Sequence, residues 1–555
     1  MKSQDQHAIL YLEVCHESGE HRVPLHTSVV LFLLSYCECK SFKVFLVSPA
    51  KSSASPTIDH LPKSLEVSQV GRESLPPLVR GCRLPCVLDE SGRLCRAGLA
   101  VVLRHIINRT LEDNPTRNDV LALLGFKKTC LKACAEVSKW TRLCELGIPS
   151  SVEEHLQSPS KVESLLPLAI LCLEQHLSEP VKVHNDDKIR RQKLKQQKQN
   201  GVTTIPIVEM DTNLAQSNDR LELDAALAKL SVDADPGLAT RECSDIRRVK
   251  TTELPPLEHV FAEGLYFTLT DVVLLPCIHQ YLCSLKTHAE HILDRLPRLL
   301  LWYRRVQEVP GVQLAATACG ITFSTSWTGP SCPSEASAQH SLSSPLECEE
   351  TNQQLQFIGG PRPTLAKLKE NGIEAMFFPH PCPSWTVPWE HLPEAINPTE
   401  GKMSDVRAER KKQQLNNLVA MVTELSQSAS TIVDFCSGTG HVGIVLAHAL
   451  PECKILLIEN KEESLVRAQS RATELGLQNI GFIQANLDYF TGPFDIGVGL
   501  HACGVATDMV MEHCIQAGAA FVISPCCYGF IQNANKFSFP RSQRFQETLT
   551  YKAAN

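Results

Sequence analysis

The carboxyl-terminal third of the chain alternates short apolar runs with amphipathic segments. Segments 441–450 and 461–476, which lie between such runs, repeat their apolar positions with the period of a helix. The runs predicted to be strands are 431–435, 454–459, 479–485, 495–500 and 519–524. Short, nearly continuous apolar strands that alternate with helices predict a parallel sheet covered on both faces. We therefore expect an α/β domain that binds its ligand at the carboxyl ends of the strands.

The amino-terminal half contains patterns typical of helices. Thr268 and Asp271 stand three residues apart just before an apolar run, as a pair that caps the first N–H groups of a helix does. The stretch 293–312 predicts another helix, closed by Pro310 and Gly311.

A further amphipathic helix is predicted within 118–147, after a break at Gly125. Cys130 and Cys134 fall on one face of it. Because a metal site would need two more ligands nearby, packing in the core is the preferred interpretation of these thiols.

Two polar stretches divide the chain. Residues 199–255 break any long apolar period and residues 323–355 are rich in Ser and Pro, which predicts linkers. The expected divisions are a domain over 1–110, a helical domain over 111–322 with a disordered insert at 188–255, a linker over 323–355 and a domain over 356–555. Six basic side chains and no acid occupy 188–198. This run either contacts RNA, an acidic partner or a nuclear import receptor, or forms a solvated helix.

Composition narrows the class of protein. Of the 555 residues, 43% are hydrophobic and 21% are charged, as in ordinary globular proteins. The 54 basic and 61 acidic residues give a net charge of −7, so a polyanion would need a local basic patch. The 23 scattered cysteines indicate reduced thiols, and the start of the chain is too polar for a secretion signal. No run of about 18 apolar residues predicts a membrane span, and we expect a cytoplasmic protein.

Several features of the first half resemble glutathione S-transferases. They are the Thr268 and Asp271 pair, the stretch LPRLLLWYRRV with the Val-Pro-Gly-Val that follows, and residues 84–106, where Leu84-Pro85 stands at the family's cis-proline position. The resemblance implies a thioredoxin-like domain followed by an all-helical domain.

The residues that would bind glutathione are replaced. The family's Glu/Gln-Ser pair falls on Arg96 and Ala97, which lack the groups that hold the γ-glutamyl end. Tyr36, Cys37 and Cys39 lie in an apolar stretch. We expect them in the core or at a strand end, and not in the role of the residue that activates the thiol of glutathione. We expect a scaffold or docking role for this half, with glutathione binding as the alternative.

The first strand of the α/β domain runs into a glycine-rich bend, Asp434-Phe-Cys-Ser-Gly438-Thr-Gly440-His-Val-Gly443. Such a bend lets the backbone approach a ligand, and it would suit a dinucleotide, S-adenosylmethionine or only close helix packing. Asp434 would repel a pyrophosphate but attract an ammonium group. Glu459 ends the second strand, where a carboxylate can accept both ribose hydroxyls. Together these acids favour S-adenosylmethionine, with Gly438 and Gly440 beside it.

Further candidates follow the later strands. Asn486 is placed to hydrogen-bond an adenine edge, or forms an Asx turn. His501 titrates near neutral pH and is a candidate base for an acceptor hydroxyl, or it closes a turn. Thr507 and Asp508 are expected to cap the next helix.

The fifth strand is followed by Cys526, Cys527 and Tyr528. The two cysteines suit packing in a turn, which is the preferred interpretation. They also suit metal ligation with Cys503 and His501, or a thiolate nucleophile for methylation of a pyrimidine carbon.

These motifs together resemble the class I S-adenosylmethionine-dependent methyltransferases, which have a Rossmann-like fold. D-x-C-S-G-x-G, L-H-x-C-G-x-A-T-D and P-C-C-Y are most similar to the transfer-RNA ribose 2′-O-methyltransferases, which have His where Tyr528 stands. The resemblance implies S-adenosylmethionine as cofactor, catalytic candidates His501, Cys526, Cys527 and Tyr528, and RNA as acceptor. The alternative is a non-catalytic scaffold.

The family's sheet contains two more strands than the pattern predicts. About thirty residues follow the last motif, too few for two strands and a helix. We therefore expect a shortened domain, as in an alternative product, with one open or unstable sheet edge.

Overall fold

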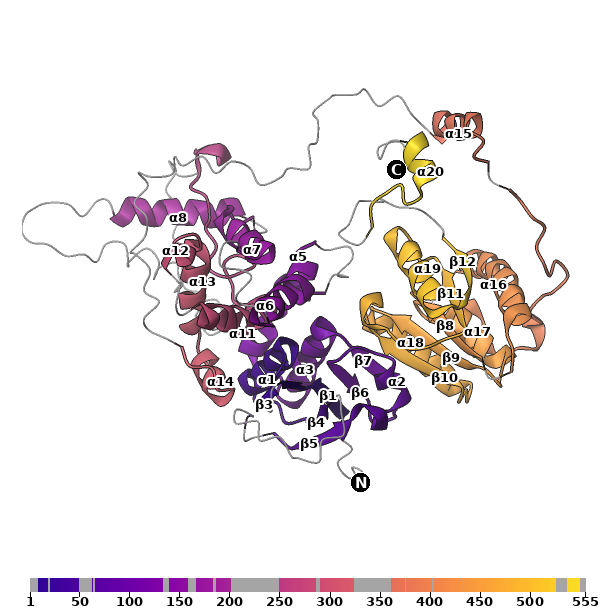
Figure 1. Ribbon diagram of the computed structural model, residues 1–555, viewed down its shortest axis with the longest axis horizontal. Coiled ribbons are helices and arrows are strands. Elements are labelled where there is room, and N and C mark those ends of the chain that lie inside the picture. The colour runs from indigo at the N-terminus through magenta and orange to yellow at the C-terminus, as the bar shows by residue number, and fades with distance from the viewer. Residues whose placement is uncertain are drawn as a thin grey trace, which may run out of the picture. The chain divides into compact units, whose positions relative to one another are not determined.

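The computed structural model divides into two compact units (Figure 1). Unit 1 consists of Met1–Leu75, Leu84–Glu90 and Gly98–Pro333, and unit 2 consists of Pro76–Arg83, Ser91–Ala97 and Ser334–Asn555. The residues that the structure describes are 8–17, 20–48, 62, 65–132, 139–157, 166–182, 186–200, 249–285, 290–323, 361–374, 376–401, 404–428, 430–525 and 537–549. Two short pieces from the first hundred residues thus belong to the carboxyl-terminal unit.

A small sheet forms the amino-terminal part of unit 1. Strand β1 (Ala8–Glu13) pairs in parallel with β4 (Phe42–Ser48) and antiparallel with β6 (Cys86–Leu88), and β4 pairs in parallel with β5 (Val67–Gly71). Helices α1 (Leu25–Cys37) and α3 (Leu99–Asp113) pack against each other, and the peptide bond Leu84-Pro85 is cis, as predicted. Tyr36, Cys37 and Cys39 are buried in the core, which confirms their expected place.

The helical part of unit 1 is organised around α11 (Leu269–Ser284). Thr268 is its N-cap, and the predicted capping box with Asp271 is present. The buried Asp271 carboxylate accepts hydrogen bonds from the N–H of Thr268 (2.8 Å), the N–H of Ala262 (2.8 Å) and Nε1 of Trp302 (2.7 Å). Trp302 belongs to α13 (Pro297–Gln307), so this carboxylate joins the start of α11 to the next long helix.

Unit 1 contains further helices, 3-10 turns and two short strands. They are β2 (Cys15–Glu17), β3 (Glu20–Arg22), η1 (Arg72–Ser74), α4 (Asn118–Ala122), η2 (Phe126–Lys128), α5 (Lys139–Arg142), η3 (Leu143–Gly147), α6 (Ile148–Gln157), α7 (Leu168–Ser178), α8 (Asp186–Asn200), η5 (Thr251–Glu253), α12 (Glu290–Leu293) and α14 (Val312–Ala318). Among the described helices, none combines the length and apolar character needed to cross a membrane.

The predicted helix after Gly125 is wrong for residues 126–132. Lys127, Lys128 and Leu131 have positive φ, which an α-helix does not allow, and this segment turns instead. The turn buries Cys130, whose thiol lies 3.3 Å from a carboxylate oxygen of Glu263, so core packing is confirmed for this cysteine. Cys134 lies outside the described residues.

The basic run 188–198 lies in α8. Two of its arginines are used inside unit 1, because Arg190 donates to the carbonyl of Pro255 (3.0 Å) and Arg191 to that of Val249 (3.0 Å). The two ends of the predicted insert 188–255 are thus joined to each other by hydrogen bonds, while residues 201–248 lie outside the described part of the chain.

Unit 2 is built on a parallel sheet with the strand order β12-β11-β8-β9-β10-β7. Its strands are β7 (Leu94–Ala97), β8 (Thr431–Phe435), β9 (Lys454–Glu459), β10 (Ile480–Gln484), β11 (Ile496–Leu500) and β12 (Ala520–Ser524). Its main helices are α16 (Asp405–Leu425), α17 (His441–Ala449), α18 (Glu462–Glu474) and α19 (Val505–Ala517). The predicted α/β fold and its five strands are confirmed. The strand order changes direction between β8 and β11, and such a switch point opens a ligand crevice.

At one edge of this sheet β12 pairs only with β11 among the described strands, and Phe521 is 45% exposed. At the other end of the strand order within unit 2, β7 pairs in parallel with β10, with Leu94 opposite Phe482 and Arg96 opposite Gln484. The sequence pattern did not reveal β7 as a strand of this sheet.

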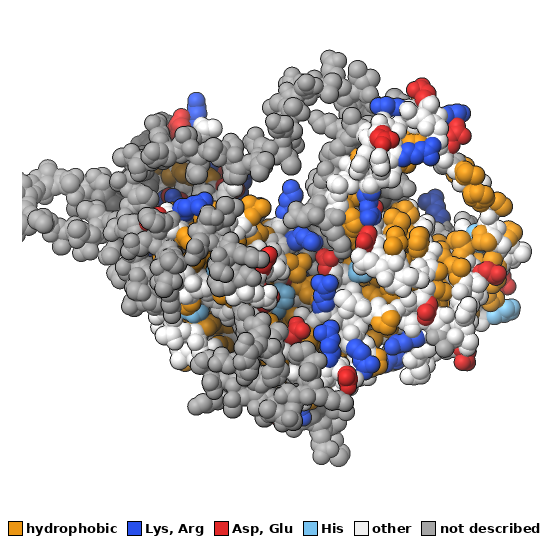
Figure 2. Space-filling model, viewed as in Figure 1, with side chains coloured by type: hydrophobic (Ala, Val, Ile, Leu, Met, Phe, Trp, Pro, Cys, Tyr) orange, Lys and Arg blue, Asp and Glu red, His pale blue; other side chains and the backbone are white. Residues whose placement is uncertain are grey.

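The smaller elements of unit 2 are α2 (Pro77–Arg80), α15 (Pro361–Glu370), η6 (Trp389–His391), η7 (Glu394–Ile396), η8 (Pro398–Gly401), η9 (Leu487–Tyr489) and α20 (Gln543–Thr548). Met376, Phe377 and Phe378, which follow α15 in the chain, are exposed. Figure 2 shows hydrophobic side chains at the surface. In contrast, Val387 and Ile396 are buried in the core of the sheet domain. Residues 376–378 therefore lie outside that core, which the chain rejoins at Val387.

Candidate functional site

The three glycines of the bend after β8 have different roles. A Cβ on Gly443 would lie 2.4 Å from Cδ1 of Leu457, and one on Gly440 would lie 2.8 Å from Cβ of Ala468. These two glycines let α17 and α18 pack closely on the sheet. Gly438 has φ +55° and nothing within 4 Å of the place of a Cβ. Packing therefore does not explain Gly438, which faces open space at the carboxyl end of β8.

Asp434 lies buried beneath the bend. Its Oδ2 accepts a hydrogen bond from the N–H of Gly443 (2.9 Å), which ties the end of β8 to the first turn of α17. Burial raises the pKa of this carboxyl to about 7, and the negative charge of Glu459 adds to the rise. The hydrogen bond and the positive charge of Lys411 oppose it. A cation in the crevice would favour the ionised form.

Glu459 lies beside the bend at the end of β9. One carboxylate oxygen accepts from the N–H of Gly438 (2.8 Å) and the other from the N–H of Lys461 (2.9 Å). The structure thus brings the predicted acid and the predicted glycine together. Each oxygen of a carboxylate has a second lone pair, so Glu459 can still accept hydrogen bonds from a ligand.

Buried polar atoms without a partner gather at three strand ends. Oγ of Ser437, Oε1 of Gln484 and Nδ1 of His501 are buried and have no hydrogen-bond partner among the described residues. They follow or end β8, β10 and β11, respectively. Because buried polar atoms are normally hydrogen-bonded, this arrangement favours a polar ligand in the crevice. Asn486, also buried, follows β10 and caps η9.

Helix α16 adds side chains that the sequence analysis missed. Oε1 of Gln414 lies 3.1 Å from Nε2 of His501. Burial lowers the pKa of His501 and of His441, and the positive charge of Lys411 lowers both further. Lys411 and Gln414 stand one turn apart on α16, the helix just before β8. Their place on one side of that helix was the feature of the sequence that could have pointed to them.

The remaining predicted site residues have other places. Thr507 donates its hydroxyl hydrogen bond to the carbonyl of Ala502, and the N-cap of α19 is Gly504, so Thr507 is not the cap. Asp508 lies in the first turn and pairs with Arg541 (3.3 Å). Cys526, Cys527 and Tyr528 lie outside the described residues. Their interpretations as metal ligands or as a thiolate nucleophile therefore stay predictions.

The glutathione alternative concerns the helix starts of unit 1. The N–H of Ala100, in the first turn of α3, donates to Oε1 of Glu145 (3.0 Å), and the N–H of Leu25, which begins α1, donates to Oε1 of Glu153 (2.8 Å). Helix N-termini attract anions, and these two are already occupied by carboxylates of the same chain. A glutathione carboxylate would have to displace Glu145 from α3.

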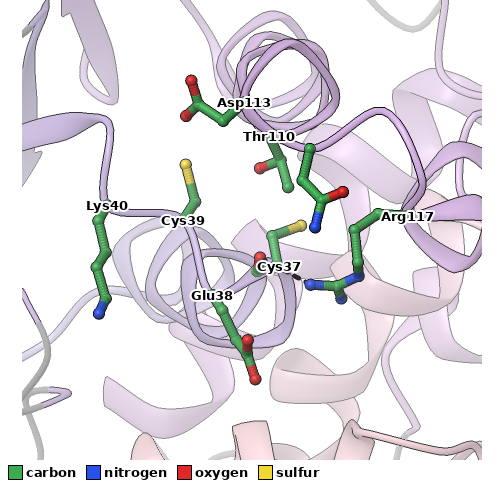
Figure 3. Close-up of a pocket in the computed structure, with 8 residues that line it drawn as sticks. Cys37, Glu38, Cys39, Lys40, Thr110, Asp113 and Arg117 are labelled. Carbon is green, nitrogen blue, oxygen red and sulfur yellow. Dashed lines mark hydrogen bonds between the residues drawn. The ribbon is translucent and has the colours of Figure 1, made fainter.

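One pocket of unit 1 lies at the carboxyl ends of α1 and α3 and has a volume of about 270 Å³ (Figure 3). Cys37 and Cys39 line it, and their sulfur atoms point in different directions. Burial raises the pKa of the Cys37 thiol to about 12, and Arg117 is paired with Asp119 (2.8 Å). The pocket therefore offers neither a thiolate at Cys37 nor an unpaired arginine.

Comparisons with known proteins concern both the sheet domain and the chain as a whole. A family described as "Methyltransferase domain" matches residues 410–534. The glutathione S-transferase C-terminal domain-containing protein of Xenopus laevis is 58% identical over an alignment of 545 positions that covers 96% of this chain and 87% of that protein. The chain belongs to this family. Its human member is 55% identical over 564 aligned positions, with 99% of this chain and 88% of that protein covered. The homolog from Drosophila pseudoobscura pseudoobscura is 32% identical over 567 aligned positions, with 98% of this chain and 86% of that protein covered.

Solved structures that resemble part of this family member include methyltransferases. An rRNA methylase from Streptococcus thermophilus has a TM-score of 0.18 at 17% identity and covers 21% of this chain and 72% of its own. Magnesium protoporphyrin IX methyltransferase from Synechocystis with bound SAH has a TM-score of 0.19 at 19% identity. The match covers 22% of this chain and 59% of that one.

Proposed function

We propose that unit 2 binds S-adenosylmethionine and transfers its methyl group to RNA. The observation that carries the proposal is the pairing of Glu459 with Gly438 above the buried Asp434, at the switch point of a parallel sheet in a methyltransferase domain. These residues fit the cofactor. Asp434 attracts the ammonium group directly or through water, Glu459 accepts ribose hydroxyls, and Gly438 leaves room for the nucleoside.

The bound cofactor supplies an electrophilic methyl group, and the protein aligns the acceptor and excludes water. Asn486 lies after β10, where its amide can bind an adenine edge. His501 lies after β11 with Nδ1 unpartnered among the described residues, and it takes the proton of the acceptor.

The acceptor class rests on charge. Arg407, Arg410 and Lys411 are spaced along one side of α16. Gln414 lies on the same side and contacts His501. Arg407 and Arg410 are exposed, so this side forms a basic path towards the crevice. Phosphate groups bind to such paths, and RNA is the acceptor that presents both phosphates and hydroxyls. The basic run in α8 is a second candidate contact for RNA or for a protein partner.

Calorimetric titration of S-adenosylmethionine into the full chain tests the cofactor site. We expect binding by the wild type, binding by Glu459→Ala reduced at least tenfold, and unchanged binding by the exposed control Glu452→Ala. Transfer of labelled methyl groups into RNA and protein fractions then identifies the acceptor. Equal null titrations for all three proteins would contradict the proposal.

For unit 1 we propose a scaffold role. The observation that favours it over glutathione binding is the occupation of two helix N-termini by Glu145 and Glu153. Retention on glutathione resin, with elution by free glutathione, would contradict this role and restore the alternative.

A further inference from the structure

His501 is held in an uncommon backbone conformation at the end of β11. Its φ is +66°, although it is neither glycine nor asparagine, and its N–H donates to the carbonyl of Ser524 on the neighbouring strand (3.0 Å). Conformations of this kind persist where the surrounding structure imposes them, often at functional sites. The imidazole is thereby directed towards α16.

The contact with Gln414 favours one tautomer of His501. Oε1 of Gln414 lies 3.1 Å from Nε2 of His501, and a carbonyl oxygen only accepts hydrogen bonds. This contact is therefore a hydrogen bond in the tautomer that carries its proton on Nε2. In a neutral imidazole the other nitrogen, Nδ1, then has a lone pair, and Nδ1 is buried without a partner among the described residues.

Burial and the nearby positive charge of Lys411 favour the neutral ring of His501. Burial lowers its pKa, and the positive charge of Lys411 on α16 lowers it further. On α19, which packs against β11, Asp508 is paired with Arg541 (3.3 Å). On β8, which pairs with β11, Asp434 is engaged by Gly443. A neutral ring near pH 7 is what a general base requires.

We propose that Gln414 is a positioning residue for methyl transfer, which holds His501 in the tautomer whose Nδ1 takes the proton of an acceptor hydroxyl. This inference rests on the proposed function. In the step, the hydroxyl oxygen forms a bond to the methyl carbon, and the bond between that carbon and the sulfur breaks with its electron pair left on sulfur. The hydroxyl proton passes to Nδ1 of His501.

The first test uses the free protein and no cofactor. Nuclear magnetic resonance of the full chain labelled with ¹⁵N-histidine reports the tautomer, and the signals of His501 are assigned by their loss in His501→Gln. We expect protonated Nε2 and unprotonated Nδ1 in the wild type. Gln414→Leu removes the accepting oxygen, so its ring should populate both tautomers, whereas the exposed neighbour Gln413→Leu should match the wild type.

A second variant covers the case in which Gln414→Leu disturbs folding. Gln414→Glu keeps an accepting oxygen and adds negative charge, so it should retain the tautomer and raise the pKa of His501. Protonated Nδ1 in the wild type, or a His501 pKa that does not respond to Gln414→Glu, would overturn the inference.

Methyl transfer provides an independent readout. We expect Gln414→Leu to lower kcat at least tenfold with unchanged affinity for S-adenosylmethionine. We expect Gln414→Glu to retain activity, with the acidic limb of its pH profile moved to higher pH. An unchanged kcat and pH profile in both variants would overturn the inference. If the wild type transfers no methyl group, the proposed function fails, and the tautomer measurement still decides the role of Gln414.

Discussion

Arg96 on β7 forms an ion pair with Glu462, the first residue of α18, at 2.9 Å between Nη2 and Oε1. Nε of Arg96 also donates to the same oxygen at 3.2 Å. The arginine side chain is only 10% exposed, so this pair is better shielded from water than a surface pair. Together with the pairing of β7 and β10, it anchors the segment from the amino-terminal half in unit 2.

Removal of this arginine should loosen β7. We expect Arg96→Ala to destabilise unit 2 by about 1–3 kcal/mol, because charge-assisted hydrogen bonds are lost in a partly buried place. Hydrogen exchange measured by mass spectrometry should then be faster in β7 and β10 than in the wild type. The exposed Arg407→Ala is the control. Equal protection in all three proteins would show that the ion pair does not anchor β7.

We expect the buried Asp434 to make both the stability of the protein and its affinity for the proposed cofactor depend on pH. Its pKa is about 7 in the folded protein, above its ordinary value of 3.8. Between these values the folded state holds a proton that the unfolded state lacks, so this group's contribution to stability falls as the pH rises. A cofactor with an ammonium group prefers the carboxylate, so affinity should fall by up to about tenfold per pH unit below pH 7.

Calorimetry at pH 6, 7 and 8 measures this linkage. Asp434→Asn should bind S-adenosylmethionine more weakly, and its affinity should depend less on pH than that of the wild type. The cofactor's own amino group titrates equally in both experiments, so the difference between the two proteins reports Asp434. Parallel pH profiles would contradict the predicted role.

Two glycine substitutions should separate packing from binding. In Gly443→Ala the new methyl group would meet Leu457 at 2.4 Å, and we expect a loss of about 1–3 kcal/mol of stability. In Gly438→Ala the methyl group would meet no atom, so only the positive φ opposes it, at a cost of about 1 kcal/mol. The temperature of thermal unfolding should therefore be lower for Gly443→Ala than for Gly438→Ala. In calorimetry, Gly438→Ala should lose more affinity for the proposed cofactor than its small loss of stability would explain.

The carboxylate at the start of α3 should act as a structural cap. Glu145→Ala leaves the buried N–H of Ala100 without its partner, and we expect it to destabilise the protein by about 1–3 kcal/mol. The exposed Glu154→Ala is the matched control. Thermal unfolding checks the difference. Stabilisation of the wild type by millimolar glutathione would indicate that the ligand displaces Glu145.

The part of the fold that could be predicted from the sequence is the part set by local pattern. The five strands of the α/β domain follow from short apolar runs, and the capping box at Thr268 and Asp271 follows from a spacing of three residues. The meeting of Glu459 and Gly438 could be predicted because parallel strands end at one edge of a sheet.

The rest depends on pairings between distant residues. Arg96 marks a strand that pairs with β10, almost four hundred residues further along the chain, and no local period reports such a partner. Gln414 stands on a helix whose apolar pattern shows that it packs but not which strand end its polar side reaches. The turn at 126–132 was missed because the apolar spacing there continues while the backbone does not stay helical.

The position of β7 affects how the protein is divided for experiments. A fragment that starts after residue 355 would contain the proposed cofactor crevice but leave the backbone of β10 unpaired along the edge that β7 covers. Unpaired edges of this kind recruit strands from other molecules. Aggregation of such a fragment would therefore reflect its missing strand, and expression as the full chain preserves the sheet.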